Sequence, residues 1–190
     1  MKKIYVLLVA FLSVVVISWK FLVKDVGHKN VEWTEYLGGP DRNHYSPLTN
    51  IDSSNVSRLK VAWEYHTKDS GQMQCNPIIV NGILYGMTAS TQPFALDATT
   101  GKEIWRKKSA EVVMYNTSRG VTYWEQGDDK RILFTTGPWL YAVNAKTGDP
   151  VMSFGDSGKT SLKTGLGISA KEKFVVSNTP GTLFENLIIM

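Results

Sequence analysis

Two stretches of this chain repeat one pattern. Residues 94–105 read FALDATTGKEIW, and residues 141–154 read YAVNAKTGDPVMSF. Each begins as a short apolar strand, breaks at a turn that contains Thr-Gly, and resumes as a second apolar stretch. Gly101 and Gly148 lie 47 residues apart, and so do Ala95 and Ala142. A period of this size indicates a repeated supersecondary unit.

The sequence before each repeat supplies two further strands. Residues 78–88 read IIVNGILYGMT, in which Asn81-Gly82 joins two apolar runs and is a strong hairpin signal. The first copy is therefore a four-stranded meander. The second copy is expected to use RGVTYWE (119–125), RILFTTG (131–137), LYAVNA (140–145) and DPVMSF (149–154) as its strands. A third begins with FVVSN (174–178), a Pro180-Gly181 turn and LFENLIIM (183–190).

Repeated four-stranded sheets at this spacing predict an all-β fold of the β-propeller type. In each blade the Ala leaves room, the Gly permits the tight turn, and a tryptophan such as Trp105 can lie across the gap to the next blade. Trp63, in LKVAWEYHT (59–67), is expected on another fourth strand, one that would complete the last blade and close the ring. We therefore interpret the tryptophans as structural.

The chain is too short to close a propeller, which needs roughly four to eight blades. It carries one loose strand, two full blades and half of a third. It also ends on LIIM (187–190), an apolar strand without a partner, and complete proteins avoid such exposed edges. We expect an N-terminal fragment of a longer chain.

The N-terminus predicts an export signal or membrane anchor over residues 1–24. Two lysines precede an apolar run from Ile4 to Trp19, and no small-residue cleavage site follows. An uncleaved anchor is favoured over a cleaved signal peptide. Four of the 21 basic residues precede the first acid, Asp25, which leaves 17 basic against 17 acidic residues. This balance argues against a nucleic-acid partner. The single cysteine, Cys75, is expected to be buried.

Four phrases, in order, resemble the pyrroloquinoline quinone (PQQ) dependent dehydrogenases. They are GGPDRNHYSPLTNIDSSNVSRLKVAWEYHT (38–67), ALDATTGKEIW (95–105), SRGVTYW (118–124) and FGDSGKTSL (154–162). The resemblance covers residues 33–190 and implies an eight-bladed propeller with about two and a half blades present, in addition to the apolar helix that the sequence itself predicts at the N-terminus. It divides residues 25–190 into a closing-strand region (33–67), blades at 74–109 and 117–155, and the start of the next blade at 174–190.

The resemblance also implies a cofactor and its ligands. In this family PQQ lies on the propeller axis, and Ca²⁺ or Mg²⁺ polarises the quinone. Arg119 matches the arginine that reaches the quinone oxygens, and Gln74 matches a polar residue at the edge of the cofactor. Thr179 is chosen over Ser177 and Asn178 as the hydroxyl donor to a PQQ carboxylate.

Other features of the family are missing from this chain. Alcohol-oxidising members carry two adjacent cysteines before the arginine, where this chain has VMYNTSRG (113–120), so a sugar or polyol substrate is favoured. Full-length membrane glucose dehydrogenases carry several N-terminal helices, where one is expected here. The family's metal ligands and catalytic base are expected beyond residue 190. The spacing of His28, His44 and His66 forms no metal-binding pattern.

The resulting functional prediction is an oxidoreductase. The chain is expected to be part of a quinoprotein dehydrogenase at the inner membrane that faces the periplasm, oxidises a sugar, polyol or alcohol, and passes electrons to a quinone or cytochrome. The alternatives are a non-catalytic propeller scaffold of the outer-membrane assembly type and, less favoured, a glycan-binding propeller. The arginine phrase and the 38–67 phrase favour the enzyme.

Overall fold

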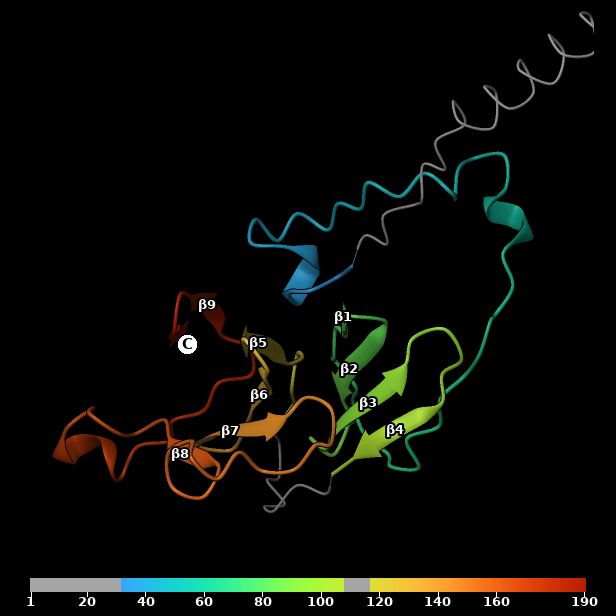
Figure 1. The fold of residues 1–190 in the computed structure, drawn as a ribbon. Helices are drawn as coiled ribbons and strands as arrows, with labels where there is room; N and C mark the ends of the chain where they lie inside the picture. The colour runs from blue at the N-terminus through green and yellow to red at the C-terminus, as the bar shows by residue number, and fades with distance from the viewer. Residues whose placement is uncertain (1–31, 108–116) are drawn as a thin grey trace, which may run out of the picture. The chain divides into compact units, whose positions relative to one another are not determined.

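The computed structural model describes residues 32–107 and 117–190, and in these ranges the fold is all-β, as predicted (Figure 1). The strands of the described ranges form two four-stranded antiparallel sheets and one hairpin. Short 3-10 turns occupy η1 (Tyr36–Gly38), η2 (Val56–Arg58) and η3 (Ile168–Ala170). The apolar helix and anchor expected over residues 1–24 lie outside the described residues. None of the helices found in residues 32–107 and 117–190 is long and apolar enough to cross a membrane.

The first sheet confirms the predicted meander. It consists of β1 (Ile78–Val80), β2 (Ile83–Met87), β3 (Pro93–Asp97) and β4 (Glu103–Arg106), in that order across the sheet (Figure 1). Asn81 and Gly82 form the turn between β1 and β2, and Val80 pairs with Ile83 on either side of it. The apolar runs and the turn residues between them were therefore sufficient to place these strands.

The second sheet confirms three predicted strands and corrects the fourth. It runs from β5 (Thr122–Gln126) through β6 (Asp129–Thr136) and β7 (Trp139–Asn144) to β8 (Lys159–Ser161). The expected strand over residues 149–154 is wrong. Pro150 and Val151 pair briefly with β7, and the chain then turns away over residues 152–158 before β8 resumes the pairing. Pro150 lacks the N–H that a continued ladder needs.

The last hairpin is also shifted from the predicted position. Strands β9 (Thr182–Phe184) and β10 (Leu187–Ile189) pair across Glu185-Asn186, not across Pro180-Gly181. The expected strand at residues 174–178 is not regular, and residues 59–67 likewise form no regular strand. An isolated run of β-formers becomes a strand only where another strand offers it a ladder.

The core lies mainly between the first two sheets. Buried side chains of both sheets form one cluster, which contains Ile78, Tyr85 and Ala95 from the first sheet and Ile132, Phe134 and Val143 from the second. Leu133, between two of these residues, faces the other way and packs with Leu140, Ala142, Leu183 and Ile188. Successive residues of β6 therefore bury both faces of the sheet, as stacked sheets require.

Tryptophan docking joins the sheets as the sequence predicted. The Trp105 indole N–H, at the end of the first sheet, donates to the carbonyl oxygen of Ala145 in the second at 2.9 Å. A Cβ on Gly148 would lie 2.7 Å from the Trp105 ring, and Gly148 has a φ of +72°. A residue with a side chain would therefore meet both backbone strain and the docked ring.

The same contact recurs one repeat earlier. The Trp63 indole N–H donates to the Ala98 carbonyl oxygen at 3.2 Å, and a Cβ on Gly101 would lie 2.5 Å from the Trp63 ring. The Tyr65 ring then packs against Phe94 with centroids 5.2 Å apart. Residues 59–67 therefore dock on the first sheet through side chains, although they form no regular strand.

Candidate cofactor-binding site

The topology gathers particular loops at one end of the sheets. Strand β1 begins at the end where β2 finishes, because the two are antiparallel. Residues 74–77 and the β2–β3 turn (88–92) therefore share one end of the first sheet, and the turns at 81–82 and 98–102 share the other. By the same reasoning residues 117–121 and the Gly137-Pro138 turn share an end of the second sheet.

Backbone hydrogen bonds join the three segments that lead into β1, β5 and β9. The Asn76 N–H donates to the Arg119 carbonyl oxygen at 2.9 Å, and the Arg119 N–H donates to the Asn178 carbonyl oxygen at 2.8 Å. Asn76 precedes β1, Arg119 precedes β5 and Asn178 precedes β9. The three predicted cofactor residues lie on or beside this row, since Gln74 comes two residues before Asn76 and Thr179 directly follows Asn178.

Gly120 makes the close approach of these segments possible. It has a φ of +147°, and a Cβ there would lie 2.8 Å from the Asn76 carbonyl oxygen and 3.3 Å from Pro180 Cγ. The buried Ser118 hydroxyl donates to the Gly120 carbonyl oxygen at 3.2 Å. The Ser-Arg-Gly sequence therefore fixes the backbone on both sides of Arg119, while Arg119 itself stays exposed.

The three predicted side chains have polar groups available. Among the described residues, neither the Arg119 guanidinium nor the side-chain amide of Gln74 has a hydrogen-bond partner, and Arg119 has no carboxylate in salt-bridge range. Gln74 and Thr179 are half-buried. One cation and two neutral polar groups are a donor set suited to an anionic ligand.

Thr135, a residue that the sequence did not single out, holds the segment before β9 in place. The Thr135 hydroxyl, at the end of β6, donates to the Ser177 carbonyl oxygen at 2.6 Å. The Ser177 hydroxyl in turn donates to the Thr179 carbonyl oxygen at 3.0 Å. The Ser177 hydroxyl is thus engaged with the backbone two residues farther on, and the choice of Thr179 stays a prediction. No sequence signal links residues 135 and 177, because they meet only through packing of β6 against the next segment.

Cys75 lies between Gln74 and Asn76 but does not have the character of a reactive thiol. It is half-buried rather than fully buried, and packs against the core cluster. Burial raises its pKa to about 11, although the Met87 N–H donates to its sulfur at 3.2 Å and opposes that rise. The thiol is therefore protonated at neutral pH and is structural.

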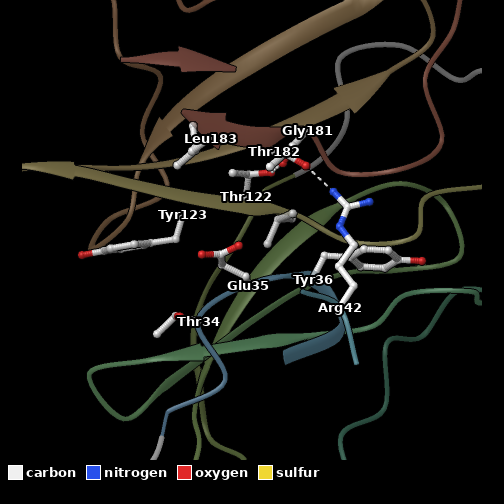
Figure 2. Close-up of a pocket in the computed structure, with 10 residues that line it drawn as sticks. Thr34, Glu35, Tyr36, Arg42, Thr122, Tyr123, Gly181, Thr182 and Leu183 are labelled. Atoms are coloured by element: carbon white, nitrogen blue, oxygen red, sulfur yellow. Dashed lines mark hydrogen bonds between the residues drawn. The ribbon is translucent and has the colours of Figure 1, made fainter. Parts of the chain in front are cut away.

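A separate hollow of about 160 Å³ lies farther along β5 and β9 (Figure 2). Figure 2 shows Glu35, Tyr36 and Arg42 facing these strands, with the Arg42 guanidinium donating to the Thr182 hydroxyl. Arg42 also lies over the Tyr36 ring, 5.7 Å from its centroid. None of the three predicted cofactor residues lines this hollow, so it is distinct from the row at Arg119.

No cluster of three or more His, Cys, Asp or Glu side chains occurs in the described residues. His44 and His66 are exposed, and His66 Nε2 lies 3.8 Å from a Glu64 carboxylate oxygen. His28 lies outside the described residues.

Comparison with known proteins now assigns the family. Residues 33–190 match the PQQ family, described as the beta-propeller domain of glucose/ethanol/alcohol dehydrogenases. The chain belongs to this quinoprotein dehydrogenase family. It is 32% identical over 179 residues to the glycerol dehydrogenase large subunit of Gluconobacter thailandicus, which covers 84% of this chain and 24% of that protein. It is 29% identical over 183 residues to the quinoprotein glucose dehydrogenase of Escherichia coli (strain K12), covering 84% and 23%.

A solved quinoprotein has the same fold. The quinohemoprotein alcohol dehydrogenase from Comamonas testosteroni superposes with a TM-score of 0.67 at 20% identity, over 89% of this chain and 24% of that one. The chain thus spans about a quarter of the length of these relatives.

Proposed function

We propose that this chain is the N-terminal part of a membrane-anchored periplasmic quinoprotein dehydrogenase. The enzyme would oxidise a sugar, polyol or alcohol and pass the electrons to a quinone or cytochrome acceptor. When bound, PQQ would supply the redox chemistry by taking up the two electrons of the oxidised CH–OH group. The observation that carries the proposal is the row of backbone bonds at Asn76, Arg119 and Asn178, within a chain that belongs to the PQQ family.

The residues of this chain would bind and orient the cofactor. Arg119 would place its guanidinium, which is always charged, against the quinone oxygens and stabilise negative charge there. Gln74 would contact the cofactor edge, and Thr179 would donate its hydroxyl to a carboxylate. This chain would therefore contribute binding groups and no general base.

Other parts of the proposal rest on the sequence and on the family. The lysine-flanked apolar run of residues 1–24 supports an inner-membrane anchor with the propeller in the periplasm. The family favours eight blades and a Ca²⁺ or Mg²⁺ ion whose ligands would lie beyond residue 190. The absence of adjacent cysteines at 113–120 favours a sugar or polyol substrate.

The test is PQQ binding and dye reduction by the full-length protein that carries this chain. We expect Arg119→Ala to weaken PQQ binding about 10- to 100-fold, the range expected for losing a charge-assisted hydrogen bond. Arg119→Lys should restore part of the affinity, because lysine keeps the positive charge but lacks the planar guanidinium that can donate two parallel N–H bonds. Arg58→Ala is the matched control, since Arg58 is exposed and lies on η2, away from the row.

Two results would count against the proposal. A folded wild-type protein that neither binds PQQ nor reduces dye with any sugar, polyol or alcohol would favour the scaffold alternative. Equal affinities in Arg119→Ala and Arg58→Ala would remove the role assigned to Arg119.

A further inference from the structure

An exposed loop leads from the docked stretch at residues 59–67 to Gln74. Its residues 68 and 70–73 are exposed, and Asp69 alone within 68–73 is half-buried. The Asp69 Oδ2 atom accepts a hydrogen bond from the Ser90 N–H at 2.9 Å. Ser90 belongs to the β2–β3 turn, so this bond ties the loop to the end of the first sheet where the predicted cofactor residues lie.

The turn that receives Asp69 is itself firmly held. The Thr88 N–H donates to the Gln92 carbonyl oxygen at 2.9 Å, and the Thr91 N–H donates to the Thr88 carbonyl oxygen at 3.0 Å. Thr88 and Thr91 are both buried. Asp69 is therefore bound to a turn that is held by hydrogen bonds of its own.

The loop is fixed again just after Gln74, by the Asn76 N–H bonded to the Arg119 carbonyl oxygen. Between the two ties, Gly71 passes close to the turn, since a Cβ on Gly71 would lie 3.3 Å from Ala89 Cβ. Burial alone would raise the pKa of Asp69, but the neighbouring polar groups of Thr67, Thr88 and Ser90 outweigh it and hold that pKa well below its usual range. Within the described residues the Ser90 N–H bonds Oδ2, while the buried Oδ1 atom has no hydrogen-bond partner. Asp69 is therefore ionised at neutral pH, and the Ser90 N–H donates to a charged carboxylate.

We propose that Asp69 is a positioning residue, which holds the 68–74 loop on the β2–β3 turn and so places Gln74 for cofactor binding. This inference rests on the proposed function, because its effect is measured on PQQ affinity. Without the Asp69 bond, the loop would be held only downstream of Gln74, by the Cys75 sulfur that accepts the Met87 N–H and by the Asn76 N–H bonded to the Arg119 carbonyl oxygen. Gln74 would then sample several positions, and ordering it would cost conformational entropy on binding.

The experiment is a double-mutant cycle on the full-length protein. We expect Asp69→Ala to weaken PQQ binding about tenfold, and Asp69→Asn, which keeps an acceptor oxygen, to weaken it less. In a Gln74→Ala background, Asp69→Ala should have no further effect. Asp97→Ala is the matched control, because Asp97 accepts the Thr99 and Thr100 N–H groups at 3.0 and 2.7 Å in a turn at the opposite end of the same sheet.

A second readout needs no cofactor. Hydrogen exchange of the amides at residues 70–76 should become faster in Asp69→Ala and stay unchanged in Asp97→Ala. A purely structural role would lower the melting temperature in both variants without changing PQQ affinity in either. Unchanged exchange, unchanged affinity, or an equal loss of affinity in the Gln74→Ala background would each overturn the inference. Failure of the wild type to bind PQQ would instead overturn the proposed function, whatever the exchange result.

Discussion

Adding one methyl group at Gly148 tests the tryptophan docking that joins the sheets. Any Gly→Ala change at positive φ costs about 1–2 kcal/mol, because the left-handed region strains an L-residue. At Gly148 the new Cβ would also lie 2.7 Å from the Trp105 ring, where overpacking costs a further 1–3 kcal/mol or so. Gly82 is the matched control, with a φ of +74° and no atom within 4 Å of its Cβ position.

We therefore expect Gly148→Ala to lower the free energy of unfolding by about 2 kcal/mol more than Gly82→Ala does. Urea unfolding followed by far-ultraviolet circular dichroism measures the difference, and thermal midpoints serve if unfolding is irreversible. The Trp105 fluorescence should shift only in Gly148→Ala, as the indole leaves its buried position. Equal destabilisation in the two variants would refute the docking explanation and leave only the turn requirement.

Three further predictions concern the end of the sheets where the predicted cofactor residues Gln74, Arg119 and Thr179 lie. Thr135→Val removes the hydroxyl that donates to Ser177; we expect it to weaken PQQ binding with little change of fold, and titration of PQQ into the purified protein checks this. Because burial raises the pKa of Cys75 to about 11, iodoacetamide should modify it far more slowly at pH 8 than a free cysteine, and comparable rates would contradict its burial. The pKa of Asp69 is lower in the folded than in the unfolded chain, so the unfolded chain binds more protons in acid and stability must rise with pH. The contribution of Asp69 to the free energy of unfolding should be fully present above about pH 4, the usual pKa of an aspartate, and be lost as the pH falls through the lowered pKa of the folded state. Between pH 7 and pH 2 the melting temperature should therefore fall less in Asp69→Asn than in the wild type.

Local sequence determined the first sheet, because each of its signals acts between neighbours. Asn81-Gly82 favours a tight reversal between two apolar runs, and a two-residue turn sets the register by pairing Val80 with Ile83. The repeat seen in Gly101 and Gly148 also predicted that Trp105 docks on the next unit, since repeats at a fixed period stack in the same way. The cofactor role of Arg119 followed from family resemblance and stays a prediction.

Tertiary structure decided the features that depend on long-range partners. The fourth strand of the second sheet lies at Lys159–Ser161 because only there does the chain return to β7, after Pro150 has interrupted the ladder. The pairing of Thr135 with Ser177 and of Asp69 with Ser90 likewise joins segments whose separation in sequence carries no period. The sequence determined which units repeat and where their tight turns lie, because turn residues and apolar runs are local signals. Only packing between units decided where strands end and which loops are hydrogen-bonded at the end of the sheets that carries Gln74 and Arg119. Those contacts form once the sheets have stacked.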